Sequence, residues 1–104
     1  MCGNPTEIQG HENTVACIRC SKPYYPRISP CVIVVVTKGD YCLLARQLNW
    51  ADGLFSAVAG FIEVGESAED AIHREVYEEV GIHVRKPVYV GSQTWPFPSQ
   101  LMLG

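Results

Sequence analysis

The sequence has little positive charge: its 104 residues include 8 Lys and Arg against 11 Asp and Glu, for a formal net charge of −3. It also lacks an apolar run of eighteen residues and a signal-like start, so we expect a chain that neither spans nor enters a membrane. We expect an intracellular protein, although the sequence does not distinguish cytoplasm, mitochondria and peroxisomes. A hydrophobic content of 47% indicates a globular chain and argues against disorder.

Basic residues are also scarce near the N-terminus, where the first thirty residues contain three Lys or Arg against two Glu. Recognition of nucleic acid requires a clustered basic patch. The sequence therefore argues against a nucleic-acid-binding module in this region. Of three hypotheses about function, a nucleic-acid-binding role is the least favoured.

Disulfide bonds are not indicated by the cysteine pattern. The five cysteines are odd in number and the sequence has no signal-like start, so we expect a reducing compartment. Two of the cysteines, Cys31 and Cys42, lie in apolar runs and are expected to be small buried side chains.

The other three cysteines have the spacing of metal ligands. Cys17 and Cys20 form a C-x-x-C knuckle, and Cys2 lies upstream of it. Two complete knuckles hold a structural zinc ion with four thiolates, and here one ligand is missing. His11 is a less favoured candidate for the fourth position, and three cysteines alone are weak evidence for zinc.

Acidic residues are concentrated in one stretch, 60–82, which holds seven of the eleven and a single Lys or Arg, Arg74. The seven are Glu63, Glu66, Glu69, Asp70, Glu75, Glu78 and Glu79. A charge run of this kind is most often a solvated surface. Here the acids share one basic partner, and a divalent cation would remove the repulsion between neighbouring carboxylates.

The second half of this stretch predicts a helix. Ser67 and Asp70 resemble a capping box at its start, and Gly81 suits the left-handed position that ends a helix. Three glutamates then lie together within about one turn, beside the apolar stripe of the helix: Glu75, Glu78 and Glu79.

Strands are predicted on both sides of the acidic stretch. The apolar run 31–36 predicts a strand buried on both faces, and 41–45 predicts the return strand of a hairpin. A third strand, 54–59, leads directly into Gly60. After the helix, the valine spacing in 84–90 predicts a further strand.

The run 92–99, Ser-Gln-Thr-Trp-Pro-Phe-Pro-Ser, is chemically unusual. Its two prolines exclude regular helix, and Trp95 and Phe97 present flat aromatic faces. It is either a packed surface loop or a surface on which a base or a nicotinamide ring stacks.

The stretch 60–82 matches the Nudix box at all of its specified positions. These are Gly60, Glu66, Arg74-Glu75-Val76, Glu78-Glu79 and Gly81-Ile82. The run 92–98 matches a second motif, S-Q-P-W-P-F-P, except at Thr94. With the cysteine pattern, these motifs resemble the NADH pyrophosphatase branch of the Nudix hydrolases. The resemblance covers residues 2–104.

The resemblance implies an α/β fold, the Nudix α/β/α sandwich around a mixed sheet, preceded by a small zinc ribbon. Residues 1–29 would be a partial zinc ribbon, and residues 30–104 the N-terminal part of a Nudix hydrolase domain. Domains of this family continue with more strands, a second helix and a further metal-binding glutamate, so we expect a chain truncated at both ends.

The resemblance also implies an activity: metal-dependent hydrolysis of the diphosphate bond of NADH or NAD to AMP and nicotinamide mononucleotide, by a homodimer. Some members also remove NAD caps from RNA, and the sequence does not decide between these substrates. Two alternatives stay open. The chain is a catalytically incompetent fragment of such an enzyme, or it is a Nudix hydrolase of another nucleoside diphosphate derivative.

Individual roles follow from the same resemblance. Glu75 and Glu79 would bind the catalytic Mg²⁺ or Mn²⁺, with Glu78 assisting and the Ala59 carbonyl completing part of the coordination shell. All three glutamates are candidate catalytic residues, and Glu79 is the preferred general base. Arg74 would orient the glutamates by pairing with them.

Two further sets of residues are implied as ligands. The structural zinc would be bound by Cys2, Cys17 and Cys20. The dinucleotide would be contacted by Glu12, Tyr25, Gln93, Thr94, Trp95, Pro96, Phe97, Pro98, Ser99 and Gln100.

Overall fold

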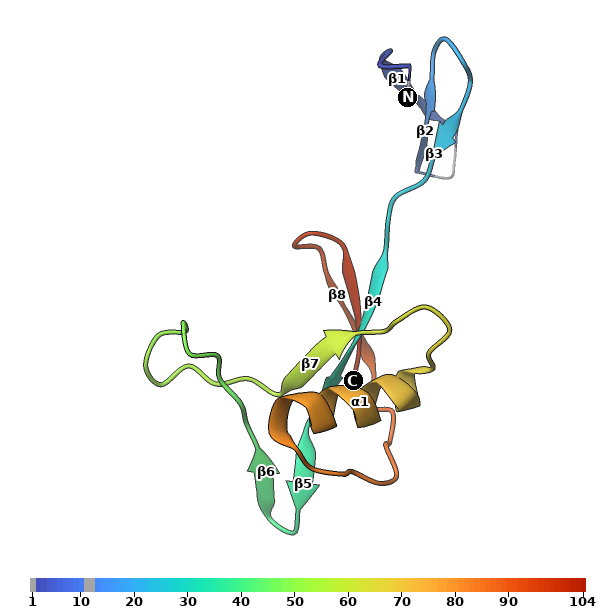
Figure 1. Cartoon of the computed structure of the whole chain (residues 1–104). Coiled ribbons are helices and arrows are strands. Elements are labelled where there is room, and N and C mark those ends of the chain that lie inside the picture. Colours follow the sequence, from blue (N-terminus) through green and yellow to red (C-terminus); the bar gives the residue numbers. More distant parts are fainter. Residues whose placement is uncertain (1, 11–12) are drawn as a thin grey trace.

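The computed structural model describes residues 2–10 and 13–104, whose strands form three sheets (Figure 1). One of them, the ribbon sheet, stands apart at the end of an elongated molecule of 59 × 32 × 22 Å. Its strand order is β1-β2-β3, and both pairs are antiparallel. The strands are β1 (Thr6–Gln9), β2 (Thr14–Cys17) and β3 (Pro23–Tyr24).

The central sheet is mixed, with strand order β7-β4-β9-β8. Its strands are β4 (Ser29–Val34), β7 (Val58–Phe61), β8 (Ser92–Trp95) and β9 (Gln100–Leu103). β4 runs antiparallel to β7 and parallel to β9, while β8 and β9 form an antiparallel hairpin. The predicted α/β class with a mixed sheet is therefore confirmed.

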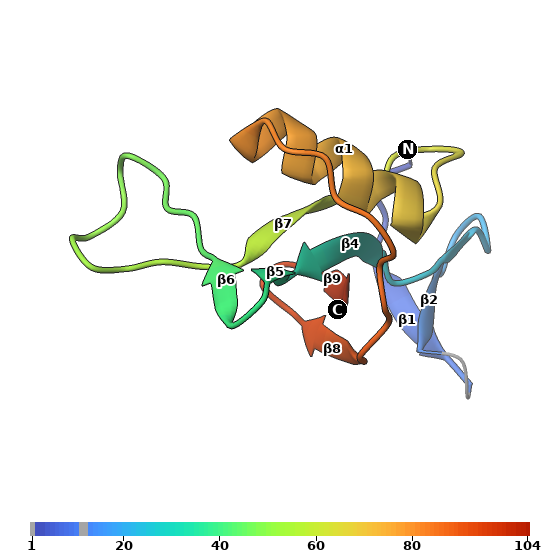
Figure 2. The ribbon, with the colours of Figure 1, turned by 90° about the horizontal axis from the view of Figure 1, so that it is seen from below.

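The helix α1 (Ala68–Val80) packs across β7 and β4 (Figure 2). It begins where the sequence predicts, because the Ser67 hydroxyl accepts a hydrogen bond from the Asp70 N–H at 3.1 Å and donates one to the Asp70 carboxylate at 2.7 Å. It ends at Gly81, which adopts a left-handed φ of 70° and donates its N–H to the Tyr77 carbonyl.

The core lies between α1 and the central sheet. Val32, Val58 and Val76 have at most 1% of their surface exposed, and Ala71 is equally buried. Burying each valine stabilises the fold by roughly 1.5–3 kcal/mol. The apolar stripe predicted beside the glutamates therefore faces the sheet. Its packing places the glutamate side chains at the margin of the interface between α1 and the sheet.

The predicted strand 31–36 is divided in the structure. β4 ends at Val34, and β5 (Val36–Lys38) pairs with β6 (Tyr41–Leu43) in a separate hairpin. The prediction of a strand buried on both faces is wrong beyond the first two residues, since Val35 is 59% exposed. Where the chain leaves the sheet for this projecting hairpin, its side chains lose the cover of α1.

The two cysteines in apolar runs differ for the same reason. Cys31, in β4, is buried with 4% of its surface exposed, as predicted. Cys42, in β6, is exposed, so its predicted burial is wrong.

Two other predicted strands also differ from the structure. The third strand begins later than expected, at Val58, and the preceding residues make a single bridge between Ala45 and Ser56. Residues 84–90 form no strand. Lys86 has a φ of 54° and Pro87 lacks an N–H, so the valine spacing does not lead to an extended ladder there.

The aromatic run 92–99 is part of the sheet. Its first half is β8, and its second half is the turn that reverses the chain into β9. Among the residues that the structure describes, no helix has the length and apolar character needed to span a bilayer.

Candidate functional site

Arg74 is the centre of the polar contacts on α1. Its Nε and Nη2 donate to the two Glu66 carboxylate oxygens at 2.8 Å each, and Nη1 donates to Glu75 at 2.8 Å and to Glu78 at 3.2 Å. Nη2 also donates to the Phe61 carbonyl at 2.9 Å. All five guanidinium N–H groups therefore have a partner. The predicted pairing of Arg74 is therefore confirmed for Glu75 and Glu78 but not for Glu79.

Gly60 provides the space for the Glu75 carboxylate. A Cβ atom at position 60 would overlap all three terminal atoms of the Glu75 side chain. Glu75 therefore lies directly against the backbone of β7, with 14% of its side chain exposed. This close approach explains why the sequence needs glycine where the strand leads into the acidic stretch.

The β7 backbone also presents carbonyl groups at this point. The Ile62 N–H donates to the Pro30 carbonyl of β4 at 3.1 Å. Because main-chain groups in an antiparallel pair alternate between facing the partner strand and facing away, the Phe61 and Ala59 carbonyls both point away from β4. The Phe61 carbonyl accepts the Arg74 hydrogen bond there, and the Ala59 carbonyl lies on the same side of the strand.

The remaining two glutamates are more open to solvent. Glu78 has 58% of its side chain exposed and shares Nη1 of Arg74 with Glu75. Glu79 is exposed and has no hydrogen bond or ion pair within residues 2–10 and 13–104. Partial desolvation of its carboxylate, together with the charge of Glu75, raises the pKa of Glu79 above its ordinary value.

Glu66 has the opposite electrostatic environment. Its bidentate contact with Arg74 and a hydrogen bond from the Glu63 N–H lower its pKa to about 2. Glu66 thus holds Arg74, and Arg74 holds Glu75. The sequence analysis placed Glu66 in the Nudix box but gave it no role in the site. Its position eight residues before Arg74, in the same motif, is the feature that could have indicated this pairing.

This arrangement has the donor set of a hard divalent cation. Carboxylate and carbonyl oxygens are the ligands that Mg²⁺ and Mn²⁺ prefer. One side of α1 carries Glu75, Glu78 and Glu79. The Ala59 carbonyl, which faces away from β4, belongs to the residue just before Gly60, and Glu75 lies against Gly60. The donor chemistry of these residues suits such an ion, but among the described residues only the three ribbon cysteines bring their ligand atoms within 4.8 Å of one another.

The three ribbon cysteines also lie together. The Sγ atom of Cys2 is 3.3 Å from that of Cys17 and 3.6 Å from that of Cys20, and all three lie within 4.8 Å of one another. Tetrahedral zinc with Zn–S bonds of about 2.3 Å requires sulfur atoms roughly 3.8 Å apart. The cluster therefore fits three of the four positions around a zinc ion.

The turn of the knuckle explains this convergence. The Cys17 N–H donates to the Lys22 carbonyl and its own carbonyl accepts from the Ser21 N–H, which brings Cys20 back toward the end of β2. A hydrogen bond from the Asn4 backbone, together with the two neighbouring thiols, lowers the pKa of Cys2 to about 7.

The β8–β9 hairpin lies at the same end of the sheet as the glutamates. Phe61 pairs with Cys31, Cys31 with Met102, and Met102 with Gln93. Gln93 is therefore in the same row of the sheet as Phe61, whose carbonyl accepts a hydrogen bond from Arg74. The predicted metal-binding and dinucleotide-binding segments converge on one end of the sheet.

The aromatic side chains of the hairpin are accessible. The Trp95 and Phe97 rings meet edge to face, with centroids 6.1 Å apart and an interplanar angle of 80°. They are 46% and 75% exposed. Flat ring surfaces therefore remain open to a planar ligand.

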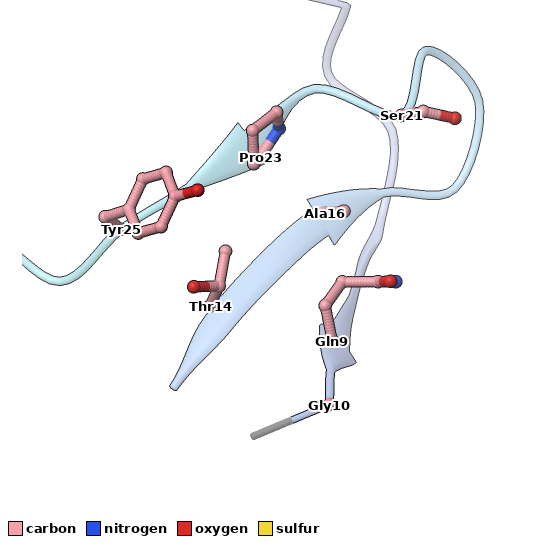
Figure 3. A pocket seen from close by; sticks show the side chains of 7 residues that line it. All are labelled: Gln9, Gly10, Thr14, Ala16, Ser21, Pro23 and Tyr25. Carbon is pink, nitrogen blue, oxygen red and sulfur yellow. The ribbon is translucent and has the colours of Figure 1, made fainter. Parts of the chain in front are cut away.

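Tyr25 lies on the ribbon side of this end. It is 67% exposed and lines an open pocket of about 550 Å³ on the ribbon sheet, to which β1, β2 and β3 all contribute residues (Figure 3). The chain that follows it is tied to the hairpin turn, because the Ser29 N–H donates to the Ser99 carbonyl at 2.8 Å. Glu12 and His11, also candidates, lie outside the described residues.

Comparison with known proteins agrees with these motifs. The family model for the NUDIX domain matches residues 26–101. NAD-capped RNA hydrolase NudC of Pseudomonas aeruginosa is 50% identical over 103 residues, and the proteins of the same name from Stutzerimonas stutzeri and Pseudomonas fluorescens are 48% and 52% identical. Each alignment covers 99% of this chain and 37% of the relative, so the chain spans little more than a third of their length.

Proposed function

Because this chain belongs to the Nudix family, we propose that it hydrolyses the diphosphate bond of NADH or NAD, giving AMP and nicotinamide mononucleotide. Its similarity to proteins named NAD-capped RNA hydrolases supports NAD-type substrates and extends the proposal to NAD caps on RNA. The observation that carries the proposal is the Glu75 carboxylate, held by Arg74 against Gly60 at the end of β7.

Glu75, Glu78 and Glu79, with the Ala59 carbonyl, are the proposed ligands of Mg²⁺ or Mn²⁺. The metal, when bound, neutralises the diphosphate charge and lowers the pKa of water. The Glu79 carboxylate accepts the proton of the water that attacks phosphorus, because it is the glutamate of this set without a contact to Arg74. Arg74 keeps the other two carboxylates in place.

The hairpin supplies the proposed substrate contacts. Trp95 and Phe97 stack with the planar base or nicotinamide ring, and the other contacts come from the rest of the run 93–100. Tyr25 and Glu12 contact the dinucleotide from the ribbon side. The shared row of Gln93 and Phe61 supports this assignment, because it sets both segments at one end of the sheet.

The ribbon has a structural role in this proposal. Cys2, Cys17 and Cys20 bind zinc, which stabilises residues 1–29 as a zinc ribbon. Residues 30–104 belong to the Nudix hydrolase domain, and the protein acts as a homodimer. The sulfur geometry supports the zinc assignment.

Release of AMP from NADH tests the activity. The chain is incubated with millimolar Mg²⁺ or Mn²⁺, and AMP is separated by ion-exchange chromatography. We expect Glu79→Gln to lower the rate by about 10²-fold or more, since it removes both a metal ligand and the base.

Glu69→Gln is the matched control, because it makes the same chemical change in the first turn of the same helix. It should retain the parent rate. A folded parent chain that releases no AMP, or an equal loss in both variants, contradicts the proposal. ADP-ribose and NAD-capped RNA tested in parallel show which diphosphate is preferred.

A further inference from the structure

Two of the ribbon cysteines differ in exposure and in how firmly the fold holds them. Cys17, at the end of β2, has 3% of its surface exposed, and its N–H and C=O are both hydrogen-bonded within the knuckle turn. Cys2 is exposed and lies outside the strands, before β1. Gly3, next to it, adopts a φ of 66° and gives the backbone wide freedom there. Cys2 can therefore move with little strain, whereas Cys17 is fixed.

The sulfur atoms of these two residues are already close. Sγ of Cys2 lies 3.3 Å from Sγ of Cys17 and 3.6 Å from Sγ of Cys20. Because a disulfide bond is about 2.05 Å long, Cys2 needs to approach Cys17 by only about 1.3 Å to form one. Cys31 and Cys42 lie outside this cluster.

We propose that Cys2 and Cys17 form a disulfide bond when a hydroperoxide oxidises the ribbon, and that this bond replaces the metal ion as its cross-link. Both cross-links join the segment before β1 to the end of β2, so the pairing of these strands is retained. In a reducing compartment such disulfides are transient and respond to redox state. The proposal concerns the ribbon alone and does not depend on hydrolysis of a dinucleotide.

The oxidation takes place in two steps. The exposed Cys2 thiolate attacks one oxygen of the hydroperoxide, the O–O bond breaks, and Cys2 becomes a sulfenic acid while the other oxygen leaves as water or an alcohol. The Cys17 thiolate then attacks the Cys2 sulfur, forming the S–S bond and displacing hydroxide, which takes up a proton. The two sulfur atoms together lose two electrons, which the hydroperoxide takes up.

The disulfide and the proposed zinc ion exclude each other. Zinc is bound by thiolates, and a sulfur atom in a disulfide is no longer a thiolate. Oxidation leaves Cys20 as the remaining thiol of the cluster, too few ligands to retain the ion. We therefore expect zinc to be released as the disulfide forms, and zinc added before the peroxide to slow its formation.

Peptide mapping without reduction identifies the bond. The chain is treated with hydrogen peroxide, its remaining thiols are alkylated, and it is digested with trypsin. Residues 1–19 contain no Lys or Arg before Arg19, so Cys2 and Cys17 lie in one tryptic peptide and Cys20 in the next. We expect the first peptide to be unalkylated and lighter by two hydrogen atoms than its reduced form, and Cys20 to be alkylated. A zinc-binding dye measures metal release in the same sample.

Two variants test which thiols the bond requires. Cys20→Ser and Cys42→Ser each remove an exposed cysteine that is not part of the proposed bond. Both should form the disulfide within residues 1–19, and Cys20→Ser should form it at least as fast as the parent, because it lacks a zinc ligand. Loss of the disulfide in Cys20→Ser would show that Cys20 takes part in the bond.

Hydrogen exchange tests whether the disulfide replaces the metal as a cross-link. We expect the oxidised, metal-free chain to keep amide protection in β1 and β2, and the reduced chain to lose it when a chelator removes metal. Dithiothreitol with chelator should abolish the protection of the oxidised chain, and dithiothreitol with zinc should preserve it.

Three results overturn the proposal. One is a peptide 1–19 that remains fully alkylated after Cys42, an exposed thiol in the same chain, has been oxidised. Another is a disulfide that links residues 1–19 to the peptide containing Cys20. The last is an oxidised ribbon whose amides exchange as fast as those of the reduced, chelated chain, which would show that the bond does not replace the metal.

Discussion

The two clusters of candidate metal ligands differ in how their like charges are tolerated. On α1, three glutamates share their surroundings with Arg74, which contacts Glu75 and Glu78 directly. In the ribbon, Cys2, Cys17 and Cys20 have hydrogen bonds with one another and with the ribbon backbone. The carboxylate cluster carries its own cation, whereas the thiol cluster would receive its positive charge from a bound metal.

This difference predicts which cluster is organised before metal binds. The helix packs on the sheet through buried valines, so its carboxylates keep their positions through the fold. The ribbon sheet has few buried side chains: Thr14, Ala16 and Cys17. A sheet with so small a core depends on an additional cross-link for its stability.

The largest expected effect is loss of the ribbon fold. Replacing Cys17 with serine, or removing metal with a strong chelator, should abolish amide protection in β1, β2 and β3 while α1 stays protected. Zinc binding contributes on the order of 10 kcal/mol to the folding of small zinc peptides. Hydrogen exchange followed by NMR measures both regions in one sample.

Cys42→Ser is the control for that experiment, since Cys42 is exposed and lies outside the cluster. Unchanged ribbon protection in Cys17→Ser would contradict the dependence on metal.

The second-largest effect concerns Arg74, the positive charge within the carboxylate cluster. Arg74→Gln leaves Glu66 and Glu75, each with 14% of its side chain exposed, without their partner. Removing one member of such a pair leaves the other unpaired, so Arg74→Gln should unfold at a clearly lower urea concentration than the parent. Urea unfolding of the two proteins gives the difference in free energy.

Arg46→Gln makes the same substitution in an exposed pair, in which Arg46 contacts Asp52 at 3.0 Å. It should cost only about 0–1 kcal/mol. Equal costs for the two arginines would mean that Arg74 is not the organising group.

A third effect tests the contact between β7 and α1. Gly60→Ala forces the Glu75 carboxylate to move, and overpacking of this kind costs about 1–3 kcal/mol. Gly91→Ala is the matched control, because its Cβ would meet no atom within 4 Å. A parent-like thermal midpoint and AMP release in Gly60→Ala would show that Glu75 has another accessible position.

The smallest effect is confined to acidic pH. The folded-state pKa of Glu66, about 2, lies below its ordinary value of 4.5. The ionised Glu66 carboxylate therefore stabilises the folded state fully above about pH 4.5, and this contribution is lost as the pH falls toward 2. Glu66→Gln should be less stable at neutral pH and lose less stability on acidification. Parallel slopes of thermal midpoint against pH in the two proteins would contradict this.

The sequence predicted the parts of the molecule that local chemistry determines. Ser67, Asp70 and Gly81 set the ends of α1, since a cap is a property of a few neighbouring residues. The box and the match to residues 26–101 identify the family, and the likeness to NAD-capped RNA hydrolases agrees with the predicted branch. The clustering of the cysteines follows from the knuckle spacing.

Features that depend on distant contacts were predicted less well. The exposure of Val35 and Cys42 depends on where the β5–β6 hairpin leaves the sheet, which no local pattern specifies. The run 92–99 was interpreted as a loop or a stacking surface because of its prolines. It begins with a strand because Ser92–Trp95 has β9 as a partner. The assigned roles of the individual site residues remain predictions for the experiments above.

The contacts of Arg74 and Glu75 with β7 restrict how α1 can move. A helix lying on a sheet by valines alone can rotate about its axis and slide along it at modest cost. The hydrogen bond from Arg74 to the Phe61 carbonyl opposes sliding, and the fit of Glu75 over Gly60 opposes rotation. The orientation of Glu79, one turn further along, is thereby determined by atoms that it does not touch.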